Sequence, residues 1–172
     1  NIDQVVGSYL LDPNIEKVII EKKYPDKLYI SIDRYVNLAL VTDLRTNKPI
    51  YYKLYKSGNI VEVSFSELKN EDLNGNAIRI DNGPLDDNVY GEFVNYFLVL
   101  NSSDELIVTK FVLVGDSLTG SIENLEIDFI SPENLGKKAS AVYQRIKDPC
   151  LSESMIIDVD DLLGEVIVIC NI

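Results

Sequence analysis

The dominant hydrophobic pattern along the chain has a period of two residues. In residues 28–33, aliphatic side chains alternate with polar or amphipathic ones, and the alternation recurs in residues 61–66 and 125–129. Successive side chains of a strand point to opposite faces, so this pattern predicts strands with one face in a core and one in water. Residues 93–100 and 167–170 are apolar at nearly every position and predict strands that are covered on both faces or face a cavity.

Turn-forming residues separate these segments at short intervals, as in residues 24–26, 57–59, 101–104 and 115–117. Gly and Asn tolerate positive φ, and Pro fixes the first corner of a turn. The spacing of about a dozen strand-like segments favours an all-β fold. We expect a single domain over residues 1–172, built as an antiparallel β-barrel of eight or more strands with one or two short helices. A two-sheet β-sandwich is the alternative.

One segment is ambiguous between helix and strand. Ser131 and Pro132 are typical of a helix start, while Gly136 stands where a helix of one turn would end. We favour a helical turn over residues 132–135 followed by a strand. The alternative is a longer helix with one apolar face, formed by Leu135, Ala139, Val142 and Ile146. A second short helix is expected over residues 66–72.

Composition excludes several classes of site. The 172 residues include no His and no Trp, two Cys and one Met, and 16 basic against 28 acidic side chains give a net charge of −12. Without His there is no Ser-His-Asp triad and no His-ligated metal, and two Cys cannot build a four-thiolate site. So acidic a chain is repelled by nucleic acid phosphate. We therefore expect no enzyme activity, no nucleic acid partner and no cofactor other than a calcium ion.

The charge is concentrated in the second half of the chain. Residues 1–86 carry 11 basic and 13 acidic side chains, a net of −2, whereas residues 87–172 carry 5 and 15, a net of −10. We interpret the acidic half as a solvated surface. The alternative is an electrostatic face for a basic partner or for cations.

The two cysteines indicate the compartment. Cys150 and Cys170 lie close in the sequence with no competing thiol, which favours a disulfide over two buried free thiols. The chain begins at Asn1 without a leader, so either a signal peptide has been removed or the chain has been shortened. No apolar run approaches the roughly 18 residues that cross a bilayer. We expect a secreted or periplasmic protein without a membrane span.

Residues 70–81 place oxygen-bearing side chains at the spacing of a calcium-binding loop. Gly75 occupies the position where such a loop turns, and the candidate ligands are Asn70, Asp72, Asn74 and Asp81. An ordinary surface turn uses the same residue types, and we prefer that interpretation. The acidic clusters at residues 86–88 and 158–161 could also bind a hard cation, but we favour charges in a loop or on an edge strand that discourage pairing between strands of different molecules.

Ten tyrosines are the most distinctive part of the composition. Three of them lie in residues 51–55, and two lie with two phenylalanines in residues 90–97. Aromatic rings are well suited to packing on a sheet, which is the interpretation we favour. The functional alternative is a lining for a ligand pocket, formed by Tyr52, Tyr55, Phe93, Tyr96 and Phe97.

Gly7 and Tyr9 form a Gly-x-Tyr motif near the start of the chain, which resembles the Gly-x-Trp of the first strand in the lipocalin, or wider calycin, superfamily. Arg145 stands at a suitable distance to cover the Tyr9 ring, as a late arginine covers the tryptophan in that family. Tyr9 replaces the tryptophan, and the family's Thr-Asp-Tyr signature is absent. The resemblance implies a closed barrel with an apolar or mixed cavity.

Two functions follow as hypotheses. In the first, the protein is a non-enzymatic binder that holds a small apolar or amphipathic ligand in the barrel mouth. In the second, it is a protein-interaction module, such as an adhesin, an inhibitor or an assembly subunit, that acts through its acidic outer surface and its loops.

Overall fold

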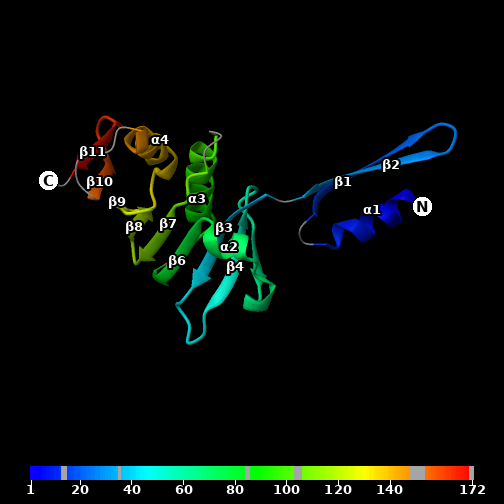
Figure 1. The fold of residues 1–172 in the computed structure, drawn as a ribbon, viewed down its shortest axis with the longest axis horizontal. Coiled ribbons are helices and arrows are strands. Elements are labelled where there is room, and N and C mark those ends of the chain that lie inside the picture. Colours follow the sequence, from blue (N-terminus) through cyan, green and yellow to red (C-terminus); the bar gives the residue numbers. More distant parts are fainter. Residues whose placement is uncertain (13–14, 35, 84–85, 103–105, 148–153, 171–172) are drawn as a thin grey trace. The chain divides into compact units, whose positions relative to one another are not determined.

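A computed structural model gives the fold, and it describes all residues except 13–14, 35, 84–85, 103–105, 148–153 and 171–172. Strands are the dominant element of the described chain (Figure 1). The chain divides into two compact units, Asn1–Asn37 and Leu38–Ile172, where the sequence predicts one domain. Each unit is described below by itself.

The first unit is a helix with a hairpin. Helix α1 (Ile2–Leu10) contacts β1 (Ile15–Lys23), and β1 pairs antiparallel with β2 (Lys27–Arg34). The strand predicted over residues 28–33 is therefore confirmed. Residues 5–9 are helical rather than a first barrel strand, because their apolar side chains repeat at helical spacing and the Asn1 side chain caps the helix by accepting from the Asp3 amide, 3.0 Å away.

The second unit is built on a nine-stranded sheet in the order β11-β10-β9-β8-β7-β6-β3-β4-β5. The described strands thus leave β11 and β5 at the two ends of the order. Its strands are β3 (Asn37–Asp43), β4 (Ile50–Tyr55), β5 (Ile60–Val63), β6 (Ala77–Asn82), β7 (Lys110–Val114), β8 (Ser117–Ile122), β9 (Leu125–Ile130), β10 (Ser154–Val159) and β11 (Val166–Cys170).

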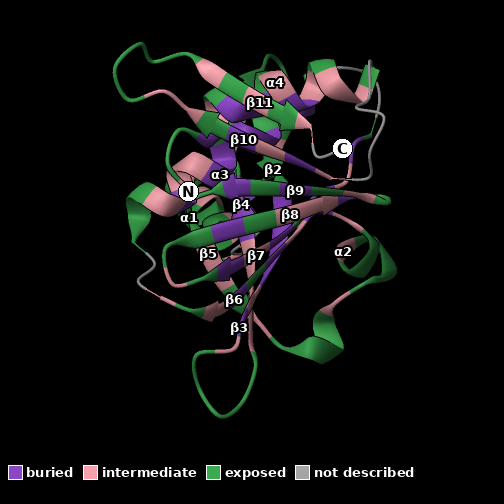
Figure 2. Ribbon diagram, turned by 90° about the vertical axis from the view of Figure 1, so that its left-hand side faces the viewer, coloured by how far each residue is buried: buried purple, intermediate pink, exposed green. Residues whose placement is uncertain are grey.

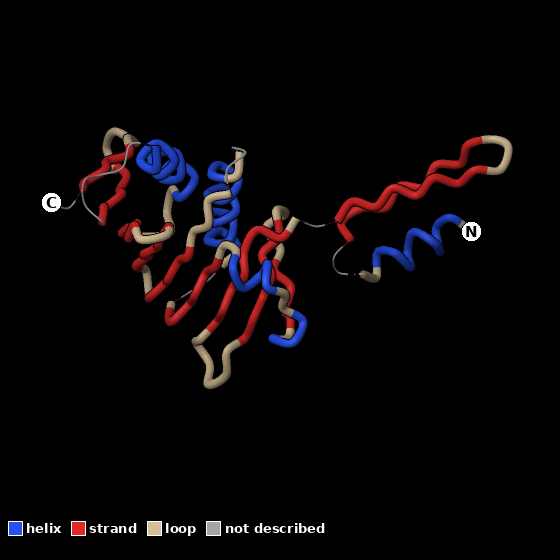
Figure 3. Tube along the Cα trace, viewed as in Figure 1, coloured by secondary structure: helices blue, strands red, loops and turns tan. Residues whose placement is uncertain are grey.

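The sheet is mixed, so the prediction of a wholly antiparallel sheet is wrong. Strand β6 runs parallel to both β3 and β7, and β10 runs parallel to β9. Parallel neighbours need a long crossover connection, usually a helix. Helix α3 (Asp87–Leu100) supplies it between β6 and β7, and α4 (Leu135–Lys147) supplies it between β9 and β10. Figure 3 shows the two helices on one side of this sheet.

The strand predicted over residues 93–100 is instead the second half of α3. The Asp86 side chain caps this helix by accepting from the Val89 amide, 3.0 Å away. Its buried positions follow helical spacing: Tyr90, Phe93, Val94, Tyr96, Phe97 and Leu100. A run that is apolar on every side fits a buried helix as well as a buried strand, and here the helix forms because its cap and its spacing agree.

The strand predicted after residue 135 is also wrong, and the longer helix is correct. Leu135, Ala139 and Val142 are fully buried along one face of α4. Gly136 does not end the helix. A Cβ at this position would lie 3.2 Å from the Asn95 Cβ, so Gly136 allows α4 to approach α3 closely.

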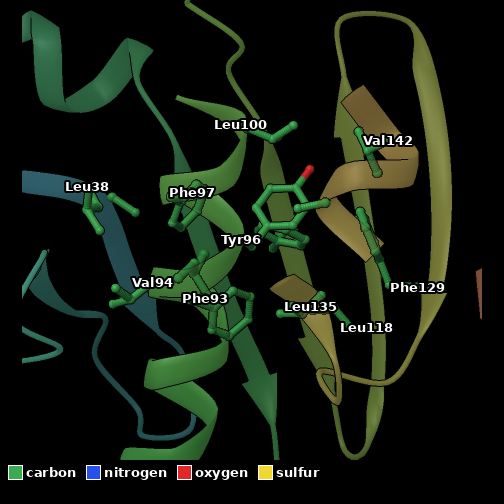
Figure 4. Close-up of a cluster of buried hydrophobic side chains, with 14 of the residues drawn as sticks. Leu38, Phe93, Val94, Tyr96, Phe97, Leu100, Leu118, Phe129, Leu135 and Val142 are labelled. Atoms are coloured by element: carbon green, nitrogen blue, oxygen red, sulfur yellow. The ribbon is translucent and has the colours of Figure 1, made fainter. Parts of the chain in front are cut away.

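The helices cover a buried core (Figure 2), and this core is rich in aromatic rings (Figure 4). Tyr96 and Phe97 of α3 meet Phe111 of β7 and Phe129 of β9, and the Tyr96 and Phe111 ring centres are 4.8 Å apart in an edge-on arrangement. The Tyr96 hydroxyl lies 3.0 Å from the Thr109 hydroxyl. The core between sheet and helices is therefore filled by side chains.

Candidate ligand-binding cleft

The carboxyl ends of the parallel strands β3 and β6 are joined by an ion pair. Asp43 ends β3, and Arg45 holds its carboxylate through both oxygens, with 2.9 Å from Nε to Oδ1 and 2.7 Å from Nη2 to Oδ2. Arg45 Nη1 also donates to the carbonyl of Gly83, just after β6, at 3.2 Å. The hydrogen bonds from Arg45 hold the pKa of the Asp43 carboxyl below its ordinary value, although burial acts in the opposite direction.

Two tyrosines stand around this ion pair. Burial raises the pKa of the Tyr90 phenol to about 12, and it raises the pKa of Tyr52 as well. Both phenols therefore stay neutral at physiological pH. Ligands of mixed or parallel α/β sheets often bind at this end of the strands, but here the ion pair occupies it and links the strand ends to each other.

A cavity of about 700 Å³ lies at the opposite, amino end of these strands. It is bounded by the segment that enters β7, by the turn between β8 and β9, and by the last turn of α4. Its apolar lining comes from Leu106, Ile107, Val108, Ile122, Leu125 and Ile146, and its polar lining from Asn74, Lys110, Ser121, Glu123, Asn124 and Arg145. We call this cavity the ligand cleft. Its volume is in the range of small-molecule sites, about 300–1,000 Å³.

The ligand cleft contains two basic side chains, although residues 87–172 have a net charge of −10. Residues 87–172 contain five basic residues, and Lys110 and Arg145 are two of them. Glu123 is the one acidic side chain among the described lining residues. Arg145 is half-buried, and neither basic side chain has an ion pair or a hydrogen bond to the part of the chain that the structure describes. Within that described part, the charges of Lys110 and Arg145 are not paired with an acidic side chain.

Buried hydrogen bonds fix the strands beside the cleft. The Asn76 side chain donates to the Leu38 carbonyl at 3.1 Å and accepts from the Thr109 amide at 2.9 Å. Asn76 and Thr109 are 8% and 0% exposed, and they join the beginnings of β3, β6 and β7. The network holds the backbone next to Lys110 in place. Less conformational entropy is therefore lost when a ligand binds in the cleft.

A second cavity, of about 610 Å³, runs between α4 and β11. Its lining consists of Lys137, Ser140, Ala141, Gln144, Arg145, Val166 and Val168. Arg145 lines both cavities, so the two adjoin at the last turns of α4. We call the second cavity the α4–β11 groove.

The aromatic residues expected to line a pocket lie elsewhere. Phe93, Tyr96 and Phe97 are at most 1% exposed in the core, and Tyr55 is 2% exposed in β4. Tyr52 contacts the core from β4 and lies near the Arg45 ion pair. None of the five lines the ligand cleft or the α4–β11 groove.

The candidate calcium ligands are divided between a helix and a strand. Asn70, Asp72 and Asn74 belong to the short helix α2 (Asn70–Asn74), and Asp81 lies in β6. The Asp81 carboxylate accepts from Arg79 at 2.6 Å. The short helix predicted over residues 66–72 is instead divided into η1 (Phe65–Glu67) and α2, with extended backbone at Leu68 and Lys69 between them. Within the described ranges, no three His, Cys, Asp or Glu side chains are grouped to hold a metal ion.

The remaining predicted residues lie in different elements and units of the chain. Gly7 and Tyr9 lie in α1 of the first unit, and Arg145 lies in α4 of the second. Cys170 ends β11, whereas Cys150 lies outside the described residues, so the disulfide stays a prediction. No helix in the described part of the chain is long and apolar enough to cross a membrane.

Models of known protein families give no match to this sequence, and neither do curated proteins. The functional conclusion therefore rests on the geometry of the cleft.

Sequence reasoning missed Lys110 and Lys138. Lys110 follows a long loop and begins a strand, and its neighbours in sequence give no sign of a cavity. Lys138 is 2% exposed and its Nζ donates to the carbonyls of Phe129 and Ser131, at 2.6 and 3.0 Å. A lysine inside the apolar face of a helix was the available signal for this buried role.

Proposed function

We propose that this protein is a non-enzymatic binding protein that holds a small amphipathic molecule with an anionic group in the ligand cleft. The observation that carries the proposal is the pairing of an apolar wall with two basic side chains, Lys110 and Arg145, for which the described residues show no ion pair or hydrogen bond. A pocket of this kind binds through apolar contact and orients its ligand through a few polar groups.

The ligand's apolar part lies against Ile107, Ile122 and Leu125, and its charged group meets Arg145 and Lys110. The Arg145 guanidinium donates two parallel hydrogen bonds to a carboxylate, a contact that a lysine cannot reproduce. The proposal keeps the small amphipathic ligand that the sequence favours. It places that ligand at one end of the sheet instead of in the mouth of a closed barrel.

The test compares three probes with the same alkyl chain: decanoate, decanol and decylammonium. Calorimetry should show decanoate binding about tenfold more tightly than decanol, which corresponds to about 1.4 kcal/mol. Decylammonium should bind most weakly. Arg145→Gln and Lys110→Gln should each reduce the difference between decanoate and decanol. Lys56→Gln removes one exposed charge on the turn after β4 and serves as the matched control.

Two results would overturn this function. One is equal affinity for the carboxylate and the alcohol, which would leave Arg145 and Lys110 without a role. The other is the absence of binding by any of the three probes under conditions in which circular dichroism shows the folded protein.

A further inference from the structure

Among the described residues, strand β11 lies at an edge of the sheet and lacks the features that usually protect an edge strand. It pairs antiparallel with β10 through Val166 to Cys170, and it ends the sheet order of the described strands. Residues 166–170 contain no charge and no proline, and Ile167 and Ile169 are 43% and 52% exposed. Natural proteins usually shield an edge with charges, proline, a bulge or a very short strand.

The other edge strand shows this protection. Strand β5 has four residues, and Glu62 stands exposed among them. The two edges of one sheet therefore differ: β5 discourages the addition of another strand, and β11 permits it.

The α4–β11 groove lies directly beside this unprotected edge. Alternate side chains of β11, Val166 and Val168, line the groove together with Ala141 of α4. A strand added along β11 would point every second side chain into the groove, because side chains alternate between the faces of a sheet.

The charged residues that line the groove are both basic. Lys137 and Arg145 stand at its two ends along α4, and the described lining contains no acidic side chain. This is a local reversal of charge in residues 87–172, whose net charge is −10. A partner that enters the groove is therefore favoured when it is acidic.

The spacing of these two cations defines a pattern for the partner. Arg145 follows Lys137 by eight positions, which is about 12 Å along a helix at about 1.5 Å per residue. Four residues of a strand cover about 13 Å at about 3.3 Å per residue. A crossover helix runs along its strands, so the two spacings can be compared directly. Two acidic side chains four residues apart on the added strand match Lys137 and Arg145. An apolar side chain midway between them lies against Val166 and Val168.

We propose that an acidic, extended peptide segment of a protein partner binds as an added strand along β11 and places two acidic side chains in the α4–β11 groove. The backbone hydrogen bonds to β11 supply affinity, and the alternation of acidic and apolar side chains supplies specificity. This surface is distinct from the ligand cleft, although Arg145 contributes to both.

The experiment uses the full chain and labelled peptides centred on Glu-Thr-Val-Thr-Glu. Fluorescence anisotropy should show binding that weakens with added salt, and the charge-reversed peptide Lys-Thr-Val-Thr-Lys should bind at least about fivefold more weakly, or about 1 kcal/mol. Lys137→Glu should weaken binding of the acidic peptide and improve binding of the reversed one. Lys56→Glu, the same change at an exposed position outside the groove, should leave both affinities unchanged.

Backbone pairing needs its own readout, because a merely electrostatic contact would also respond to charge. A peptide with methylated backbone amides on alternate residues keeps its side chains and loses donors, so it should bind at least about tenfold more weakly. The bound acidic peptide should also slow amide exchange in residues 166–170. Equal binding of methylated and unmodified peptides, unchanged affinity in Lys137→Glu, or a dimer formed through β11 that the peptide does not dissociate would each overturn the proposal.

Discussion

Arg45 holds the Asp43 carboxylate with two of its guanidinium nitrogens, at 2.9 and 2.7 Å, and the Arg45 backbone amide donates to the same carboxylate at 3.0 Å. The Asp43 side chain is 7% exposed and the Arg45 side chain is 37% exposed. The pair therefore joins a nearly buried anion to a cation that is still partly in water. It ties the end of β3 to Gly83 after β6.

Asp43→Asn should destabilise the protein by about 1–2 kcal/mol at pH 7, because a charge-assisted contact is lost while the partial exposure of Arg45 limits its strength. The folded-state pKa of Asp43 is lowered, so its contribution is fully present above the unfolded-state pKa of about 3.9 and is lost as the pH falls through the folded-state value. Urea unfolding of both proteins at neutral pH and near pH 3 measures this. If the difference in unfolding free energy did not shrink on acidification, the stabilisation would not come from the ionised Asp43 carboxylate.

Lys138 should contribute through its two backbone carbonyl partners. Lys138→Met keeps the length of the side chain and leaves the carbonyls of Phe129 and Ser131 without their donor, which should cost about 1–3 kcal/mol. Burial lowers the folded-state pKa of Lys138, so the folded protein releases this proton at a lower pH than the unfolded chain. The wild type should therefore exceed Lys138→Met in free energy of unfolding by a margin that grows from pH 7 towards about pH 10.

Denaturant unfolding of the wild type and Lys138→Met at both pH values tests this, and the comparison removes the titrations that the two proteins share. Lys137→Met, one position away and exposed on the same helix, is the control and should change stability little. If Lys138→Met and the wild type had the same free energy of unfolding at both pH values, the two hydrogen bonds from Lys138 would make no net contribution to stability.

Alternation of apolar and polar residues was sufficient to predict two of the strands. Residues 28–33 and 125–129 alternate clearly, and both form strands. The pattern failed for residues 93–100, because nearly every residue there is apolar, including the exposed Leu98, so the sequence shows no clear periodicity that separates helix from strand. The ligand cleft could not be predicted from the sequence for a different reason. Lys110 and Arg145 are 35 positions apart and meet only through the sheet order and the crossover of α4, which no local pattern encodes.

The predicted disulfide between Cys150 and Cys170 can be tested directly. Closing a loop of about 20 residues stabilises a protein by roughly 3 kcal/mol in the chain-entropy model. The intact mass should rise by two hydrogen atoms on reduction, and the reduced protein should unfold at a lower urea concentration. A Cys150→Ser, Cys170→Ser double variant is the control and should match the reduced protein. An unchanged mass under denaturing, reducing conditions would exclude the bond.

Gly120 and Gly91 provide a matched pair of substitutions to alanine with opposite expected signs. A Cβ at Gly120 in β8 would lie 2.8 Å from Phe129 Cε2 and 3.2 Å from Phe111 Cδ1, inside the aromatic core. Two rings packed against other rings cannot both retreat, so Gly120→Ala should cost about 1–3 kcal/mol. A Cβ at Gly91 in α3 meets no atom within 4 Å, and alanine favours a helix over glycine by about 0.8–1.0 kcal/mol. Gly91→Ala should therefore raise the melting temperature and Gly120→Ala should lower it. Equal changes in thermal unfolding for the two variants would mean that the aromatic core yields to an added methyl group, against the close packing of Phe111 and Phe129.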